Sequence, residues 1–375
     1  MDYKFPVLNE APPVLGKKVI MRVDLNIPII NGRIADDFRL KKIMPTLEFL
    51  QSRQAKTLLI SHTDNPSATL EPILESLKGK VKISFQKTIE EAKEALEVLE
   101  NGSFVLLENI RLFEGEESND INFAKKLSEL GDLYVNEAFS VSHREHASLV
   151  GLPKFLPHFA GLLFAEEVKS LSQVFSPEHP FLFVLGGAKF NTKLPLVKKF
   201  LDIADTVYVA GALSNDIYKA RGLEIGNSSH SENGVTNLEK IEGHQNLRNP
   251  IDIEVCSEAG KEMRAFNSLK REDKIVDIGP QSLSELSALV SNAKLIVWNG
   301  PLGFYEEGFS KGTEELAMAM ALSSAKTIVG GGDTLAAISS LGIHDKFSFV
   351  STGGGAMLDF LANETLPGIE ALQAN

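Results

Sequence analysis

Two glycine-rich segments near the end of the chain have the residue types and spacing of phosphate-binding loops. In the first, a strand-like run, Lys326 to Val329, is followed by Gly330 to Thr334 and then by the helix-like Leu335 to Leu341. Glycine removes the Cβ atoms that keep a phosphate away from backbone N–H groups, and a helix start adds partial positive charge. Asp333 offers a hard oxygen ligand for a magnesium ion carried by a nucleotide. The segment therefore predicts a nucleotide site.

The second segment repeats this pattern farther along the chain. A run from Phe347 to Val350 leads into Ser351 to Gly355, and the helix-like Ala356 to Leu361 follows. A single glycine-rich loop is weak evidence, because tight turns alone also need glycine. Two such loops, each between a strand and a helix, favour phosphate binding over turns alone.

Lysines after an earlier strand add positive charge to the same half of the chain. Lys189 and Lys193 follow Gly186 and Gly187 and are four residues apart at an expected helix start, so both can reach phosphate oxygens. A solvated helix face explains the lysines equally well in isolation, and the glycines directly after a strand favour function. Asn299 to Glu306 reads by itself as an ordinary glycine and proline turn.

Arginines and histidines follow the expected strands of the first half. They are Arg22, His62, Arg111, His143, Arg144 and His146, with Asp24, Asn26 and, in a polar loop, Arg39. Ligands of open α/β sheets bind where the strands end, and the arginine fork suits carboxylate and phosphate groups. Each histidine alone is more often a structural hydrogen-bonder, and those after residue 142 lack the spacing of a zinc pair. The cluster as a whole predicts a site for a small polyanion.

The elements that must position these residues are short apolar runs separated by helix-like segments. Such runs suit strands buried on both faces of a parallel sheet. We expect strands at Lys18–Val23, Thr57–Ser61, Val81–Phe85, Phe104–Leu107, Leu133–Val135, Phe181–Leu185, Thr206–Ala210, Lys274–Ile278, Leu295–Trp298, Thr327–Val329 and Phe347–Val350. The expected fold class is α/β, with two Rossmann-like doubly wound parallel sheets.

The length of 375 residues suits two domains. Phe164 to Phe175 has helical periodicity and is followed by a stop signal at Ser176, Pro177 and Pro180. We expect residues 1–163 to form a domain for an acidic substrate, residues 164–180 a connecting helix and hinge, and residues 181–360 a nucleotide-binding domain.

Charge and composition exclude several function classes. The formal net charge of −12 argues against a binder of nucleic acid or membrane surfaces, since both are anionic. The sole cysteine, Cys256, excludes an internal disulfide and fits a reducing cytoplasm. Met1 to Val19 does not read as a signal peptide, and no segment has the apolar length of a membrane span. No GxGxxG follows the first strand, which disfavours a nicotinamide-dependent dehydrogenase. The chain also lacks a GxxxxGK motif followed by Ser or Thr, which disfavours a Walker-type NTPase.

Together these motifs resemble those of the phosphoglycerate kinase family, from about Val19 to Leu372. The matching segments are Arg22 to Pro28, Asp37 to Arg39, Ser61-His62, Leu107 to Arg111, Val135 to Phe139, His143 to His146, Gly186 to Lys193, Asp277 to Pro280, Trp298 to Gly303, Gly330 to Thr334 and Ser351 to Ala356. They occur in the order of the family and at suitable spacing.

The resemblance implies two Rossmann-like domains that face each other across a cleft, with residues 361–375 returning to the first domain. It implies the glycolytic transfer of the acyl phosphate of 1,3-bisphosphoglycerate to ADP, giving ATP and 3-phosphoglycerate, with magnesium. It further implies a cytoplasmic monomer that binds these small molecules and neither nucleic acid nor membrane.

The resemblance also implies the roles of individual residues. Substrate binding would fall to Asp24, Asn26, Arg39, His62, Asn65, Arg111 and Arg144, and nucleotide binding to Lys189, Lys193, Gly279, Asn299, Glu306, Gly331, Gly332, Asp333 and Thr334. Asp333 would bind magnesium together with the nucleotide phosphates. Arg39, Lys189 and Lys193 would be catalytic, because phosphoryl transfer requires in-line positioning and neutralisation of charge on the equatorial oxygens. We expect Arg39 from one domain and Lys189 from the other to close on the transferring group. Domain closure would also expel water that could hydrolyse the acyl phosphate.

Three segments depart from the family pattern. Ser61 to Pro66 reads SHTDNP where the family writes SHLGRP, so Asn65 replaces an arginine and Asp64 adds a negative charge. A lost charge-assisted contact costs about 1.5–3 kcal/mol, roughly ten- to a hundredfold in affinity. Ala210 to Leu213 replaces a GGGM stretch near the adenine, and Glu137 stands where aspartate is usual. These departures leave open the alternative of a nucleotide-binding paralogue with a lost or altered acid substrate.

Overall fold

The computed structural model describes residues 3–27, 29–30, 33–34, 36–65, 68–188, 190–231, 241, 243–258 and 260–374. The chain divides into two compact units, of which unit 1 comprises Met1–Lys169 with Asn363–Asn375, and unit 2 comprises Ser170–Ala362. Among the described residues, no helix is long and apolar enough to cross a membrane.

Unit 1 is built on a parallel sheet of six strands in the order β5-β6-β4-β1-β7-β8. The strands are β1 (Lys18–Arg22), β4 (Lys56–Ile60), β5 (Ile83–Gln86), β6 (Phe104–Leu107), β7 (Leu133–Asn136) and β8 (His158–Ala160), and β2 (Ile29–Ile30) pairs with β3 (Arg33–Ile34) in a separate hairpin. The central strands are buried along almost their whole length, which explains why they consist of continuous apolar runs.

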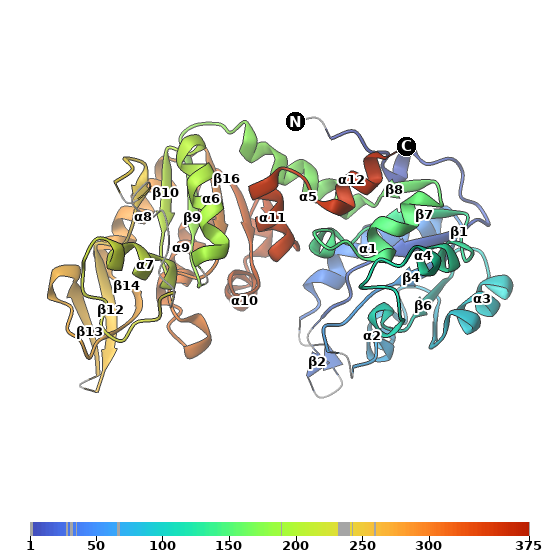
Figure 1. Ribbon diagram of the computed structural model, residues 1–375, viewed down its shortest axis with the longest axis horizontal. Helices are drawn as coiled ribbons and strands as arrows, with labels where there is room; N and C mark the ends of the chain where they lie inside the picture. The colour runs from blue at the N-terminus through green and yellow to red at the C-terminus, as the bar shows by residue number, and fades with distance from the viewer. Residues whose placement is uncertain are drawn as a thin grey trace. The chain divides into compact units, whose positions relative to one another are not determined.

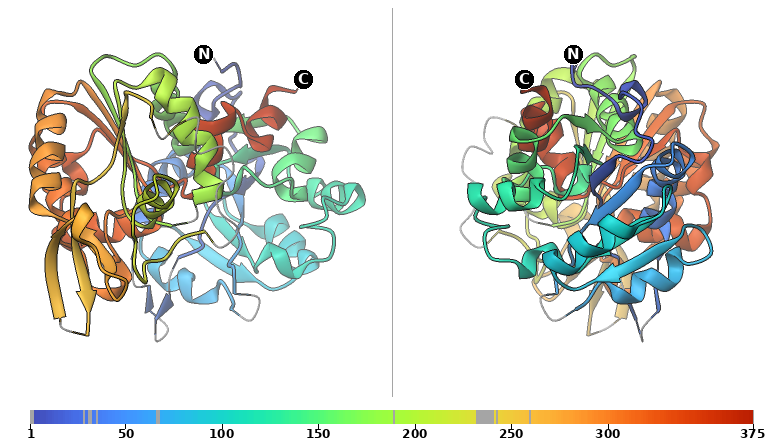
Figure 2. Two further views of the ribbon diagram at one scale, coloured as in Figure 1. Left: turned by 60° about the vertical axis from the view of Figure 1, so that its left-hand side comes forward. Right: turned by 90° about the vertical axis from the view of Figure 1, so that its right-hand side faces the viewer.

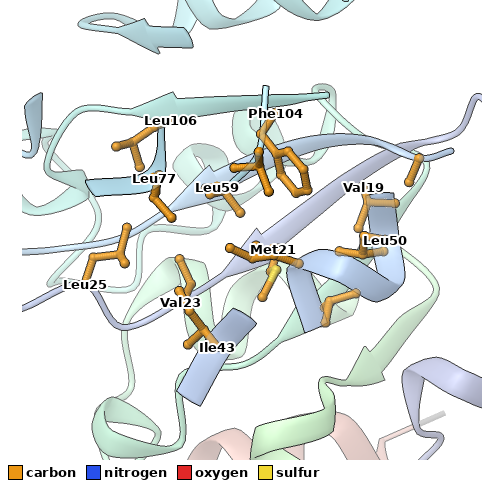
Figure 3. Packing of buried hydrophobic residues seen from close by; sticks show 14 of the residues in the cluster. Val19, Met21, Val23, Leu25, Ile43, Leu50, Leu59, Leu77, Phe104 and Leu106 are labelled. Carbon is orange, nitrogen blue, oxygen red and sulfur yellow. The ribbon is translucent and has the colours of Figure 1, made fainter. Parts of the chain in front are cut away.

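The helices of unit 1 cover this sheet. They are α1 (Phe38–Ser52), α2 (Glu71–Leu77), α3 (Ile89–Val98), α4 (Ile121–Ser128), α12 (Pro367–Gln373) and most of α5 (Leu162–Ser172). One face of the sheet forms a continuous core, in which Met21 and Leu59 pack with Ile43 and Leu50 of α1 and Leu77 of α2 (Figure 3). Helix α3 contacts β4, β5 and β6, and Thr88 caps its start by accepting a hydrogen bond from the Glu91 backbone N–H at 3.1 Å.

The last helix, α12, belongs to unit 1 although it lies at the end of the chain (Figure 1). It contacts β8 and the helical turn η4 (Ala147–Gly151). The Gly368 backbone N–H donates to the Ser142 carbonyl at 2.9 Å. A Cβ atom on Gly368 would lie 2.6 Å from the Ser142 Cβ, so a glycine is required for this close approach.

Unit 2 contains a second parallel sheet of six strands, in the order β11-β10-β9-β15-β16-β17. Its strands are β9 (Phe181–Leu185), β10 (Thr206–Val209), β11 (Leu247–Arg248), β15 (Leu295–Asn299), β16 (Lys326–Gly330) and β17 (Phe349–Val350). Its helices are α6 (Phe190–Ile203), α7 (Ala212–Ala220), α8 (Pro280–Asn292), α9 (Lys311–Leu322), α10 (Gly332–Leu341) and α11 (Gly355–Asn363). The predicted α/β class with two parallel sheets is confirmed.

One predicted strand lies in a different sheet. Lys274–Ile278 forms β14, which pairs antiparallel with β12 (Asp252–Ser257) and not with the parallel sheet. The strand β13 (Gly260–Ala265) completes this three-stranded sheet, which Figure 2, left, shows in yellow-orange, apart from the parallel strands of the unit. The prediction failed because β14 is as apolar and buried as a parallel strand, whereas β13, on the other side of β12, is exposed and charged and gives no apolar signal.

Candidate functional site

The arginines and histidines predicted to bind a polyanion lie together at one edge of the unit 1 sheet. Arg22 ends β1, His62 follows β4, and Arg111 lies in the turn after β6. Because β1, β4 and β6 are parallel, their carboxyl ends meet at this edge.

Arg22 and His62 form a buried pair at the centre of the cluster. Both side chains are almost fully buried, and an Arg22 Nη2 lies 3.3 Å from His62 Nδ1. Burial and the neighbouring Arg22 charge lower the pKa of His62 to about 3, so the ring is neutral near pH 7. A guanidinium can only donate, so His62 Nδ1 accepts and Nε2 carries the proton. His62 therefore presents an uncharged N–H donor.

Asp24 and Arg39 form the second pair. Arg39 Nη1 lies 2.7 Å from an Asp24 carboxylate oxygen and also donates to the Asn26 carbonyl at 3.1 Å. Burial raises the pKa of Asp24, but Arg39, His62 and the Ser140 hydroxyl together outweigh it and leave the pKa below its usual value. Asp24 is therefore ionised and holds Arg39 at the start of α1.

Arg111 and Arg144 are the remaining arginines of the cluster. Arg111 is largely buried, with Nη1 on the Asp64 carboxylate and Nε 3.5 Å from Glu117. Arg144 is exposed, and within the described residues its side chain makes no hydrogen bond or ion pair. His146 is partly buried, and burial together with Arg111 and Arg22 lowers its pKa to about 4. Asn65 is exposed, and its backbone N–H donates to the Thr63 hydroxyl oxygen at 3.4 Å.

Three supporting residues of this cluster were not predicted from the sequence. Arg22 Nε donates to the Ser148 hydroxyl at 2.9 Å, and that hydroxyl donates to buried Glu116 at 2.6 Å. The Ser140 hydroxyl donates to Asp24. Glu116 lies in an acidic, polar stretch that reads as a solvated loop, so no sequence signal distinguished it.

The predicted nucleotide residues of unit 2 lie at the carboxyl ends of its parallel strands. Gly186 and Gly187 follow β9, and their backbone N–H groups donate to the carbonyls of Asn299 and Pro301 at 2.9 and 2.7 Å. Lys193 is buried, and its Nζ donates to the Gly186 carbonyl at 2.7 Å. Lys189 lies outside the described residues.

The glycines of this edge divide into two kinds. A Cβ on Gly186 would lie 2.1 Å from the Pro301 carbonyl oxygen, so this glycine permits close packing between loops. By contrast, a Cβ on Gly332, Gly354 or Gly355 would meet no atom within 4 Å. The open glycines are the ones whose backbone a phosphate can approach.

The loop after β16 carries the predicted metal ligand. Gly331 has φ +103° and precedes α10, and Asp333 is exposed in the first turn of that helix. Thr334 is buried and accepts a hydrogen bond from the Gly300 backbone N–H at 2.9 Å. Asn299 is buried beside Gly331, where an added Cβ would lie 3.2 Å from its Nδ2. The arrangement brings Asn299, Gly331 and Thr334 together.

Gly279 and Glu306 lie farther along the same unit. Gly279 precedes α8, and a Cβ there would lie 2.4 Å from the Asp252 carboxyl group, so its absence of a side chain has a packing reason. Glu306 is exposed in the turn η9 (Tyr305–Glu307).

A small pocket of about 10 Å³ lies near these residues. Its lining includes Gly211, Ala212, Ile278, Leu302 and Phe304. This brings the loop after β10 against the segment before Gly279, and polar Ser214, Asn215 and Asp277 share the lining. A volume of this size has room for about one water molecule.

The altered loop Ala210 to Leu213 follows β10 and leads into α7. Ala210 and Leu213 are fully buried, so their side chains belong to the core, whereas Ala212 is only partly buried and lines the pocket. Of the residues that depart from the family pattern here, Ala212 is therefore the one able to change the shape of the pocket.

Comparisons with known proteins show to which family the chain belongs. The family model for phosphoglycerate kinase matches residues 9–364. The phosphoglycerate kinases of Dictyoglomus turgidum and Pelotomaculum thermopropionicum are 39% and 38% identical over 380 residues, covering 96% of this chain and 96% and 97% of theirs. The structure of phosphoglycerate kinase from Coxiella burnetii matches with a TM-score of 0.86 and 33% identity, covering 99% of this chain and 98% of that one. These matches give no support to the alternative of a paralogue with a lost or altered substrate, and the chain belongs to the phosphoglycerate kinase family.

Proposed function

We propose that the protein is an active phosphoglycerate kinase, which reversibly transfers the acyl phosphate of 1,3-bisphosphoglycerate to ADP to give ATP and 3-phosphoglycerate. The observation that carries this proposal is the convergence of Arg22, Arg39, His62 and Arg111 on one sheet edge of unit 1. In a chain with a formal net charge of −12, such a gathering of donors favours a specific anionic ligand.

The substrate-binding group comprises Asp24, Asn26, Arg39, His62, Asn65, Arg111 and Arg144. Arg39 and Arg111 supply charge for the carboxylate and phosphate groups of the glycerate. His62 adds an N–H donor whose neutrality spares the site a further buried charge. Asp24 positions Arg39, and Asn26 contributes an amide that can adapt to either donor or acceptor groups.

The nucleotide-binding group comprises Lys189, Lys193, Gly279, Asn299, Glu306, Gly331, Gly332, Asp333 and Thr334. The exposed start of α10 offers backbone N–H groups to the phosphates. Lys193 neutralises phosphate charge next to the Gly186 loop, and the position of Lys189 in the same sequence motif supports the same function for it. Glu306 is exposed and suited to the ribose hydroxyls.

Asp333 fits a magnesium ion that arrives with the nucleotide. Within the described part of the chain, no group of three or more His, Cys, Asp or Glu residues forms a metal cage. A single exposed carboxylate suits Mg²⁺, which keeps several waters and binds through one or two carboxylates and the substrate phosphates. Bound there, the ion would neutralise charge on the phosphate oxygens.

The chemical step needs no general base. In the direction of ATP synthesis, a β-phosphate oxygen of ADP attacks the phosphorus of the acyl phosphate, the bond from phosphorus to the acyl oxygen breaks, and the carboxylate of 3-phosphoglycerate leaves. The residues act by positioning and by neutralising charge on the transferring group. Arg39, Lys189 and Lys193 are the residues that we assign to this neutralisation.

The proposal includes a cytoplasmic monomer that acts on small molecules and binds neither nucleic acid nor membrane. The sole cysteine and the glycolytic substrates favour the cytoplasm, and the acidic net charge disfavours polyanionic partners.

A coupled assay tests the proposed function. Purified protein is mixed with 3-phosphoglycerate, ATP and magnesium, and acyl phosphate formation is followed through reductive dephosphorylation by glyceraldehyde-3-phosphate dehydrogenase. We expect a rate that requires both substrates and disappears when a chelator is added. Nucleotide binding without turnover would contradict the proposal.

A further inference from the structure

We propose that Asp64 is an internal anion that occupies the substrate's anion-binding groups and must be displaced before 3-phosphoglycerate binds. This inference rests on the proposed function of the unit 1 cluster. Asp64 thereby sets the affinity of the site, although it makes no contribution to catalysis.

The contacts of Asp64 are those expected of a bound ligand. One carboxylate oxygen lies on Arg111 Nη1, and the other accepts a hydrogen bond from Asn26 Nδ2 at 2.6 Å. The first oxygen also lies 3.9 Å from His62 Nε2, the nitrogen that carries the proton. Asp64 therefore contacts or approaches three of the groups assigned to the substrate.

Backbone hydrogen bonds hold the loop in this position. The Asp64 N–H donates to Asn26 Oδ1 at 3.3 Å, so Asn26 binds both the backbone and the side chain of Asp64. The Thr63 N–H donates to Asn109 Oδ1 at 3.4 Å, and Asn109 Oδ1 also accepts from the Arg111 backbone N–H at 3.1 Å. Asn109 thus ties the loop that carries Asp64 to the turn that carries Arg111.

Asp64 is charged yet free to leave. Burial raises the pKa of its carboxyl group, but hydrogen bonds from Arg111 and Asn26 outweigh burial and leave the pKa below its usual value. The side chain is 70% exposed, so it can rotate into water without disturbing the core. No rearrangement of the sheet is required.

Simultaneous occupancy by Asp64 and a substrate anion is unfavourable. Both need the same Arg111 and Asn26 donors, and two negative groups at one site repel each other. Asn65 stands where the family has arginine, so the loop offers no cation of its own to draw Asp64 aside. The substrate must therefore replace the contacts that Asp64 loses.

The test compares Asp64→Asn with wild type. Asparagine keeps the shape and the loop but removes the charge. Kd for 3-phosphoglycerate is measured by isothermal titration calorimetry without nucleotide, and KM and kcat are measured in the coupled assay. Water screens the exposed ion pair between Asp64 and Arg111, so its loss should have an effect at the low end for a charge-assisted contact. We therefore expect Kd and KM for 3-phosphoglycerate to fall about tenfold, with kcat nearly unchanged.

Two further variants isolate the cause. Glu100→Gln removes one charge from the same unit at the exposed Lys82–Glu100 pair, away from the site, and should leave Kd unchanged. Asp64→Glu keeps the carboxylate and should stay close to wild type. An unchanged or weaker affinity in Asp64→Asn, or an equal gain in Glu100→Gln, would overturn the inference.

The design separates this inference from the proposed function. If wild type binds 3-phosphoglycerate but transfers no phosphate, the kinase proposal fails, and the calorimetric comparison still decides for or against Asp64. If only Asp64→Asn binds 3-phosphoglycerate, displacement of Asp64 is supported. If neither protein binds it, the inference is wrong.

Discussion

At the scale of single residues, the proposed substrate cluster depends on two buried side chains, Arg22 and Asp24, and on the groups that each of them holds. Arg22 fixes the protonated nitrogen of His62 and is itself held by Ser148 and Glu116. Asp24 is ionised and holds Arg39. The cluster thus keeps its donors in place by internal hydrogen bonds, which is what preorganised binding of an anion requires.

Truncation of Arg39 is expected to separate turnover from nucleotide binding. Arg39→Ala removes the positive charge that we assign to the transferring group and leaves buried Asp24 without its ion-pair partner, whereas the nucleotide residues of unit 2 are untouched. We expect kcat to fall about 10²–10³-fold, as for loss of one transition-state donor, while the ATP Kd changes by less than about twofold. Steady-state kinetics and calorimetry measure the two quantities, with Arg39→Lys as the charge-preserving control. Equal losses in both would remove Arg39 from the chemistry.

Residue types at strand ends could be predicted from the sequence, but their internal partners could not. Arg22, His62 and Arg111 follow buried apolar runs, which is a local signal. Ser148 and Glu116 reach Arg22 only through the fold, since Arg22 and Ser148 are separated by 126 positions. The contact of Asp64 with Asn26 depends likewise on adjacent strand ends.

At the scale of elements, the glycine-rich loops serve two different purposes. Gly186 and its neighbours allow loops of unit 2 to pack closely, whereas the loop before α10 leaves its backbone open. Both purposes give the same sequence pattern. Close packing explains Gly186 and its neighbours, and a phosphate-binding role for the open glycines stays a prediction.

Alanine at Gly331 is expected to weaken nucleotide binding. The residue has φ +103°, which strains any side chain, and its Cβ would lie 3.2 Å from Asn299 Nδ2. Gly342→Ala at the other end of α10 is the matched control, because its φ is +64° and no atom lies within 4 Å. Gly342→Ala should lose about 1 kcal/mol of stability, because Gly342 is in the left-handed helical region, and Gly331→Ala should lose about 1–3 kcal/mol, because φ 103° with ψ 136° is a region that only glycine adopts readily. Only Gly331→Ala should raise the ATP Kd, by about tenfold, and a similar rise in Gly342→Ala would contradict a local role.

Glu137 is expected to make the stability of unit 1 depend on pH. It accepts hydrogen bonds from Thr46 of α1 and from the backbone N–H groups of Leu163 and Phe164 in α5. Burial outweighs these bonds and raises the pKa of Glu137 to about 7. Because the pKa is higher in the folded state, the folded protein favours the protonated carboxyl group of Glu137. The free energy of unfolding is therefore highest below about pH 4.5 and falls as pH rises through about 7.

Urea unfolding at pH 5 to 8 of wild type and Glu137→Gln measures this effect. Glutamine cannot ionise, so wild type should lose up to about 3 kcal/mol relative to the variant across this range. The exposed Glu100→Gln serves as control, because Glu100 is ionised throughout and should show no such slope. A stability difference between wild type and Glu137→Gln that does not vary with pH would exclude Glu137 as the cause.

The predicted elements show what local pattern can and cannot reveal. Apolar runs such as Phe104–Leu107 predict buried strands because such strands bury both faces. Lys274–Ile278 has the same pattern but pairs antiparallel with β12 in a separate sheet. The pattern of one strand does not show which strand it pairs with. The short edge strand β8 gives too little signal to be predicted.

At the scale of the whole molecule, the acidic net charge and the cationic cluster act together. A formal net charge of −12 repels anions in general, so the proposed affinity for the glycerate would come from short-range contacts. We assign those contacts to the sheet edge of unit 1 and the phosphate loops to unit 2. A match to the family model over residues 9–364 spans both units, in keeping with an activity that needs both sets of residues.

The most direct measurement follows the phosphate itself. Purified protein is incubated with ATP, magnesium and 3-phosphoglycerate in the presence of hydroxylamine, which traps an acyl phosphate as the hydroxamate, and the nucleotides are observed by phosphorus NMR. The account predicts ADP and hydroxamate in equal amounts, with neither formed when 3-phosphoglycerate is omitted. Conversion of ATP to ADP that does not depend on 3-phosphoglycerate, or bound nucleotide that remains unconverted, would contradict it.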